Sequence, residues 1–238
     1  LKEEWLMHDY AIEEKLREKV VVAVVIIYIV LAIIFTPVID NIINRLCIYF
    51  GYTEIRYLKI ILSVILPGIE YGILYSFYDK IAWKWFYKWH HIPNLNGKWK
   101  ADIISELKTH KPIIEMEIKQ TWTKIKITGT SLYTNTETSS QTAAFINEEG
   151  NWYFIYSYAI KRHNNEAMND VIYTGYNKLG YTPSKNLINQ LTGLYCSQKD
   201  ITEELVKEIN ISLDDTIKNK LNGCGSKGKI IIDRVNEN

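Results

Sequence analysis

Residues 20–39 read VVVAVVIIYIVLAIIFTPVI and contain no charged side chain. A helix rises about 1.5 Å per residue, so this stretch would extend about 30 Å, the thickness of the hydrocarbon core of a bilayer. Residues 60–78, IILSVILPGIEYGILYSFY, are nearly as long and contain a single charge, Glu70. The sequence therefore predicts an N-terminal transmembrane helical hairpin, followed from Asn94 onward by a polar, soluble domain.

The overall composition averages these two unlike parts. The chain has 238 residues, a net charge of +1 and 47% hydrophobic content. We divide it into a membrane region, 1–93, and a cytoplasmic ligand-binding domain, 94–238, which is large enough for its own core. A net charge near zero argues against binding DNA or RNA polymers, which requires many phosphate-neutralising side chains. The cysteines are too few for a disulfide framework or a zinc site, so we expect a reducing compartment, no metal and no cofactor.

Basic residues near the ends of the spans predict their orientation. Residues 79–93 interleave lysines with aromatic residues, a pattern typical of a helix end anchored among lipid headgroups. Position beside a span favours this anchor over a nucleic-acid-binding patch. The first run is too long for a signal peptide and no small-x-small cleavage site follows it. We therefore expect a multi-pass membrane protein with both termini cytoplasmic. The residues behind this expectation are Lys15, Arg17 and Lys19 before the first span, Lys80, Lys84 and Lys88 after the second, and the aromatic Trp83, Trp85, Tyr87 and Trp89.

The second span has two faces that are not suited to lipid. Gly68, Gly72 and Ser76 recur every four residues and would let another helix approach closely. Glu70 lies on the other face, where a carboxylate is costly unless it meets a partner or water. Two such faces need more neighbours than one hairpin partner supplies, so we expect self-association into homo-oligomers. The alternative is that Glu70 lies at a shallow depth and extends to the headgroups.

Residues 40–59 connect the two spans and contain apolar side chains at helical spacing as far as Gly51. This pattern predicts either a short interfacial helix or a continuation of the first span.

From Asn94 the hydrophobic period changes to two, which is typical of strands. Trp99, Ala101 and Ile103 alternate with polar residues, and the parity of the next alternation flips around Trp122, which predicts a turn or bulge there. We expect Trp99 and Trp122 to be buried. Further strand candidates are 142–146, 152–160, 170–178, 190–196, 208–213 and 229–234, with one short helix at 215–221. About eight such strands predict a small antiparallel β-barrel, whose interior holds side chains or one small ligand.

No nucleophile elbow, glycine-rich phosphate loop or metal-binding helix appears in the sequence, which does not favour an enzyme. Aromatic density is the more informative feature. Trp152, Phe154, Tyr156 and Tyr158 share one strand face, and Arg162, one of two arginines in 94–238, follows them. Flat rings beside a bidentate cation suit a ligand that contains bases and phosphates. The alternative is that this face is barrel core.

Several segments occur in a recognisable order behind the hairpin: NLNGKW at 94–99, IKQTW at 118–122, TSS at 138–140, YSY at 156–158 and LTGLY at 191–195. This arrangement resembles the two-transmembrane β-barrel effectors of bacterial CBASS anti-phage systems, and the resemblance covers nearly the whole chain.

The resemblance implies a receptor of the bacterial inner membrane that binds a cyclic dinucleotide made by a partner nucleotidyltransferase. Binding would drive oligomerisation in the bilayer, disrupt the membrane and cause abortive infection. After Tyr195 the chain departs from the family pattern, which has a basic residue and a Thr-x-Gly turn. Residues 197–204 instead read SQKDITEE, in which Lys199 takes the place of the cation. The candidate ligand-binding residues are Arg162, Tyr156, Tyr158, Tyr195 and Lys199.

Two other functions remain open at this point. A membrane-anchored, lipocalin-like carrier would need an apolar cavity and few cations at its mouth. A membrane-anchored enzyme of unknown chemistry would need a constellation of reactive side chains that the sequence does not reveal.

Overall fold

A computed structural model describes residues 7–12, 14–49, 55–105, 113–131, 136–162, 171–182, 188–197 and 226–235. The chain forms two compact units, one of residues Glu13–Phe86 and one of residues Leu1–Ile12 together with Tyr87–Asn238. The expected strand 208–213, the expected helix 215–221 and Lys199 lie outside the described residues.

The first unit is helical. Helix α1 spans Glu14–Tyr49, helix α2 spans Ile55–Lys80, and a short 3-10 helix, η2, spans Ala82–Phe86. Within the described residues, Lys15–Arg45 is the one stretch long and apolar enough to cross a membrane by length and composition. Because α1 runs on to Tyr49, residues 40–49 continue the first helix.

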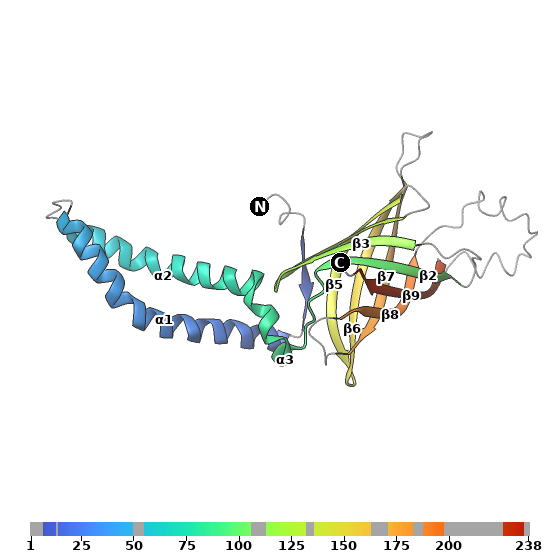
Figure 1. The fold of residues 1–238 in the computed structure, drawn as a ribbon, viewed down its shortest axis with the longest axis horizontal. Helices are drawn as coiled ribbons and strands as arrows, with labels where there is room; N and C mark the ends of the chain where they lie inside the picture. Colours follow the sequence, from blue (N-terminus) through green and yellow to red (C-terminus); the bar gives the residue numbers. More distant parts are fainter. Residues whose placement is uncertain are drawn as a thin grey trace, which may run out of the picture. The chain divides into compact units, whose positions relative to one another are not determined.

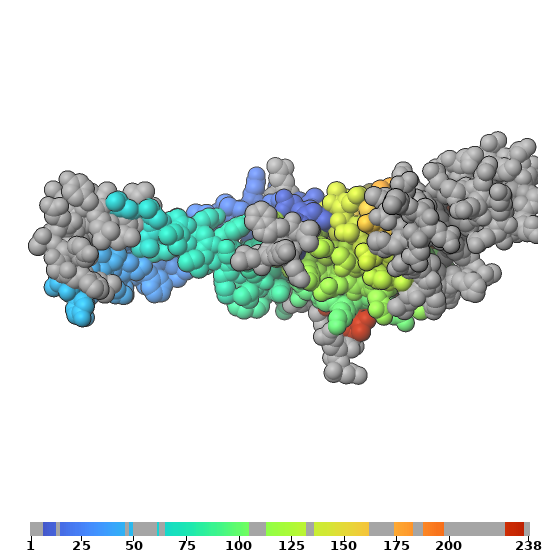
Figure 2. Space-filling view, turned by 90° about the horizontal axis from the view of Figure 1, so that it is seen from above, coloured from blue at the N-terminus to red at the C-terminus, as the bar shows by residue number. Residues whose placement is uncertain are grey.

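Helices α1 and α2 lie along each other (Figures 1 and 2). They meet through aromatic side chains, the Tyr28 ring packing edge-on against Tyr71 at 5.8 Å between centroids. Gly68 and Gly72 do not take part in this contact, because a methyl group on either α-carbon would meet no described atom within 4 Å. The small-residue face of α2 is therefore open within one chain.

The second unit is a closed β-barrel (Figure 1). Its described strands are β1 His8–Ala11, β2 Gly97–Ser105, β3 Ile113–Gln120, β4 Lys124–Ser131, β5 Thr136–Glu148, β6 Asn151–Arg162, β7 Val171–Tyr181, β8 Gln190–Ser197 and β9 Ser226–Arg234. Strands β2–β9 pair antiparallel around the barrel in the order β4-β3-β2-β9-β8-β7-β6-β5. The antiparallel barrel predicted from the alternating sequence is confirmed.

Strand β1 was not predicted. It precedes α1 in the sequence, within the stretch assigned above to the membrane region, yet it belongs to the barrel. Strands β4 and β5 pair directly only from Thr128 to Thr130, opposite Glu137 to Ser139. Beyond that point β1 lies between them, antiparallel to β4 and parallel to β5.

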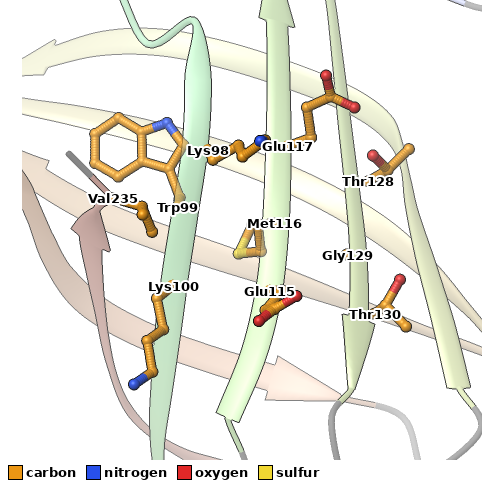
Figure 3. Close-up of a pocket in the computed structure, with 10 residues that line it drawn as sticks. All are labelled: Lys98, Trp99, Lys100, Glu115, Met116, Glu117, Thr128, Gly129, Thr130 and Val235. Atoms are coloured by element: carbon orange, nitrogen blue, oxygen red, sulfur yellow. The ribbon is translucent and has the colours of Figure 1, made fainter. Parts of the chain in front are cut away.

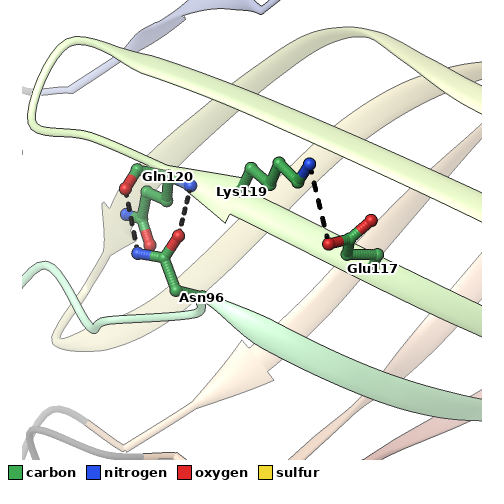
Figure 4. A network of polar contacts seen from close by, with 4 residues as sticks. All are labelled: Asn96, Glu117, Lys119 and Gln120. Carbon is green, nitrogen blue, oxygen red and sulfur yellow. Dashed lines mark hydrogen bonds and ion pairs between the residues drawn. The ribbon is translucent and has the colours of Figure 1, made fainter. Parts of the chain in front are cut away.

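One end of the barrel, here called the closed end, is covered by the helix α3, Tyr87–His90, and the residues that follow it. Ile92 and Leu95 are fully buried there. Asn96 extends the pairing of β2 with β3, because its side-chain amide exchanges hydrogen bonds of 2.7 and 2.9 Å with the backbone of Gln120 (Figure 4). The nearby ion pair of Lys119 and Glu117, at 3.7 Å, is exposed and contributes little.

Arg234 stabilises the closed end. Its guanidinium donates to the carbonyl oxygens of Ile188, Asn94 and Asn96. It also lies over the ring of Trp99, 4.4 Å from the centroid. Gly97 makes this approach possible, because its φ of 130° disfavours other residues and a Cβ would lie 3.1 Å from the guanidinium.

The predicted burial of Trp99 and Trp122 is confirmed, since each is 1% exposed. The Trp99 indole donates to the Leu95 carbonyl at 2.8 Å. Trp122 lies in the turn between β3 and β4 and packs on His90, with 4.9 Å between centroids. The parity flip in the sequence is therefore a turn.

The aromatic segment 79–93 divides into two sets. Trp83 and Tyr87 are buried, whereas Trp85 and Trp89 are 68% and 46% exposed. The expectation that all four residues face the headgroups is therefore wrong for Trp83 and Tyr87. The members of each set are four residues apart, one in η2 and one in α3.

We predict that Trp99→Ala lowers the free energy of unfolding of the barrel by about 3–5 kcal/mol, because it leaves a large cavity and an unpaired Leu95 carbonyl. Lys100→Ala, on the exposed face of the same strand, should change it by less than about 0.5 kcal/mol. Denaturant-dependent hydrogen–deuterium exchange of the barrel strands in the full chain measures both. Equal stability of the two variants would contradict the assigned role of Trp99.

Candidate functional site

The barrel interior is polar toward the end opposite the closed end. Two rows of paired residues cross strands β5 to β8 there. In the first row Ser140 lies opposite Tyr158, Tyr158 opposite Gly175, and Gly175 opposite Ser197. In the second row Ala143 lies opposite Tyr156, Tyr156 opposite Asn177, and Asn177 opposite Tyr195. We call these two rows the polar half of the interior.

The hydroxyl groups of the polar half are held by neighbouring side chains. The side chain of Asn177 hydrogen-bonds the Tyr156 hydroxyl, and that of Ser197 hydrogen-bonds the Tyr158 hydroxyl. Burial raises the pKa of both phenols well above the usual value, and adjacent tyrosines raise it further. Both hydroxyls therefore remain protonated at physiological pH and are available to donate to an anionic oxygen.

The buried side chain of Asn177 has one polar atom without a described partner. Its side chain is 3% exposed, and its Oδ1 has no hydrogen-bond partner among the described residues. An unsatisfied amide oxygen in a barrel interior costs about 1–3 kcal/mol. Native proteins retain such groups rarely, and a ligand donor is one way to satisfy them.

Gly175 makes room for the Tyr158 ring. A Cβ at this position would lie 2.6 Å from the Tyr158 Cζ and Oη atoms and 2.6 Å from the Cys196 carbonyl oxygen. Tyr158 therefore occupies the space that a side chain on β7 would fill. The ring is fixed in the interior by backbone geometry.

The next rows toward the closed end are apolar. Phe145 stacks on Phe154 at 4.7 Å between centroids, and Tyr10 packs edge-on against Phe145 at 5.4 Å. Phe154, Leu179 and Leu191 are fully buried. These side chains fill this half of the barrel, so it is core.

Of the predicted ligand residues, the structure brings together Tyr156, Tyr158 and Tyr195. Arg162 is the last residue of β6, and its backbone position has the parity of Tyr156 and Tyr158. The side chain of Arg162 and the whole of Lys199 lie outside what the structure describes. The second arginine, Arg234, belongs to the closed end.

The sequence analysis missed four interior residues: His8, Ser140, Asn177 and Ser197. They come from four strands, and only the register of those strands places them beside Tyr156 and Tyr158. Ser140 was within a segment carrying the resemblance, but without an assigned role. Asn177 had no signal in the sequence.

The described residues also form a groove of about 400 Å³ across β2, β3 and β4 (Figure 3). Its exposed walls are pairs of opposite charge, Lys98 with Glu117 and Lys100 with Glu115. These charges compensate one another, so the groove lacks the excess positive charge that phosphates require. Within the described part of the chain, no group of three His, Cys, Asp or Glu residues is placed to hold a metal ion.

A closed barrel with aromatic rings and neutral hydroxyls in one half of its interior offers groups that suit a small polar ligand. Residues 90–204 match a family model described as Cap15, cyclic dinucleotide receptor domain. This match confirms the resemblance to CBASS effectors that respond to cyclic dinucleotides. No curated protein matches the chain.

We predict that Gly175→Ala displaces the Tyr158 ring, because the added methyl group cannot avoid both the ring and the Cys196 carbonyl. Overpacking of this kind costs about 1–3 kcal/mol of stability. Gly180→Ala is the matched control on the same strand, since its nearest atom would be 3.6 Å away. Unfolding of both variants measured side by side checks the difference, and a Gly175→Ala barrel as stable as the control would contradict it.

Proposed function

We propose that the protein is a non-enzymatic effector that binds a cyclic dinucleotide in the polar half of its barrel, self-associates through its membrane helices and disrupts the inner membrane. The observation that carries this proposal is the pair of polar rows around Asn177. Tyrosine rings offer faces on which bases stack, and their protonated hydroxyls suit phosphate oxygens. The unpaired Oδ1 atom of Asn177 can accept a hydrogen bond from an N–H group of a base.

The negative charge of the ligand requires a cation. We assign this role to Arg162. Its backbone position on β6 alternates in step with Tyr156 and Tyr158, and the other arginine of the domain, Arg234, is already hydrogen-bonded at the closed end. Lys199 is the second candidate. Arg162 ends β6 and Lys199 comes shortly after β8, and the inward residues of both strands line the polar half.

The fold supports a two-pass topology. Strand β1 and strands β2–β9 belong to one sheet, so the chain before α1 and the chain after η2 end on the same side of any membrane. If α1 crosses the membrane, the chain must cross it again to return to this sheet. Helix α2 is the described helix long enough for the second crossing. The basic residues flanking the two helices favour a cytoplasmic location for this side.

Helix α2 supports assembly between chains. Gly68, Gly72 and Ser76 form an exposed face that α1 of the same chain does not cover, and Glu70 is half-buried. We propose that the small-residue face receives a helix of another subunit. Such packing depends on close backbone approach, which a larger side chain prevents.

A nucleotidyltransferase partner would supply the ligand during infection. The alternative of an apolar carrier has less support, since buried side chains fill the apolar half. An anchored enzyme would need a reactive constellation, and the polar half contains amide and hydroxyl groups with no described general base beside them except His8.

We predict that Asn177→Leu and Arg162→Ala each weaken binding of the preferred cyclic dinucleotide about tenfold or more. The first removes the polar edge at nearly constant volume, and the second removes a charge-assisted hydrogen bond of about 1.5–3 kcal/mol. Asn151→Ala, an exposed change on β6, is the control. Titration calorimetry of the detergent-solubilised full chain, with cyclic di-AMP, cyclic di-GMP, cyclic GMP–AMP and cyclic UMP–AMP, measures the effect. Affinity unchanged in both variants would place the ligand elsewhere.

We further predict that Gly72→Leu weakens ligand-driven assembly while leaving ligand affinity within about twofold, because the barrel is unaltered. Glu70→Ala should likewise spare binding but reduce toxicity in cells. Ile73→Leu, at a lipid-compatible position of the same helix, is the control. Mass photometry of each variant with and without ligand gives the assembly size. Full-sized assemblies and full toxicity in both variants would exclude this helix as the contact.

A further inference from the structure

Strand β1 is short, and its place in the barrel depends on few contacts. Two residue pairs join it to β4 and two join it to β5. In the sheet, it fills the gap where β4 and β5 no longer pair with each other. A strand held by four pairs exchanges between seated and unseated states more readily than the long strands around it.

Two side chains fix β1 to the interior. Tyr10 is 2% exposed, and its hydroxyl donates to the Thr121 carbonyl at 3.1 Å. The Nε2 atom of His8 lies 2.7 Å from the Ser140 hydroxyl. The same hydroxyl oxygen accepts the Ile127 amide at 2.9 Å, so His8, β4 and β5 meet at Ser140.

Ser140 is also a member of the polar half, directly opposite Tyr158. The pairing of β5 with β6 shifts register immediately after it, between Ser140 and Thr142. His8 therefore reaches the wall of the proposed ligand site from a strand that the family match, 90–204, does not include. A ligand that orders Tyr158 and Ser140 would also order His8.

The connection from β1 to the membrane is short. Strand β1 ends at Ala11 and helix α1 begins at Glu14. Two residues separate these ends, and the three Cα–Cα steps between them reach at most about 10 Å. With so short a connection, seating β1 in the barrel restrains the start of α1, and releasing β1 frees it.

We propose that β1 links the receptor to the membrane helices: ligand in the polar half and β1 seated between β4 and β5 stabilise each other, with His8 as the positioning residue. This inference rests on the proposed function. Linkage is reciprocal, so the factor by which ligand favours the seated strand equals the factor by which unseating the strand weakens ligand binding. Ligand binding then affects α1 through the N-terminal strand.

The test uses the full chain in detergent, with the four cyclic dinucleotides named above as probes. Hydrogen–deuterium exchange of residues 8–11 is measured with and without each probe. We expect the binding probe to slow exchange in β1 at least threefold. His8→Ala should weaken that probe about three- to tenfold and remove the protection of β1, whereas Asp9→Ala, on the exposed side of the same strand, should do neither.

The possible results separate the two claims. If a probe protects β6 and β7 but leaves exchange in β1 unchanged, or if His8→Ala and Asp9→Ala bind equally well, the link through β1 is overturned and the proposed function stands. If no probe binds or protects any strand, the proposed function fails and this inference fails with it.

Discussion

The barrel depends on closing the gap between β4 and β5. Each strand of this sheet has an apolar face that must be buried, and an open edge would expose unpaired backbone groups. Strands β4 and β5 pair with each other over only part of their length, and β1 completes the sheet from a segment that precedes the first membrane helix. One strand of the barrel is therefore connected to α1 through only two residues.

Much of the architecture could be predicted because it follows from periodicity. The uncharged run 20–39 predicted a long helix, and alternation from Trp99 onward predicted strands with one buried face. The strand β1 could not be predicted, because HDYA shows no alternation and is followed at once by a helix. Its extended conformation comes from pairing with β4 and β5, which is a tertiary effect. The burial of Trp83 and Tyr87 was missed because position beside a span favours anchoring equally for every aromatic residue there.

Only some of the interior residues could be predicted, for a related reason. The tyrosines of β6 stand out in the sequence because they share one strand. Ser140, Asn177 and Ser197 lie on other strands, so only register reveals them as partners. The segments that carried the resemblance fall into two groups in the structure. NLNGKW and IKQTW meet at the closed end through Asn96 and Gln120, whereas TSS, YSY and LTGLY supply the polar half.

The central claim is that a ligand in the barrel acts on a membrane through the helices of the same chain. The most direct measurement is release of an encapsulated dye from liposomes that contain the purified full chain. We expect release on addition of the cyclic dinucleotide that binds and none with a cyclic dinucleotide that does not bind. At a ligand concentration near the dissociation constant of the unaltered protein, the Asn177→Leu variant should release several-fold less dye. Intact liposomes after saturating ligand, in a preparation shown by calorimetry to have bound it, would contradict the account.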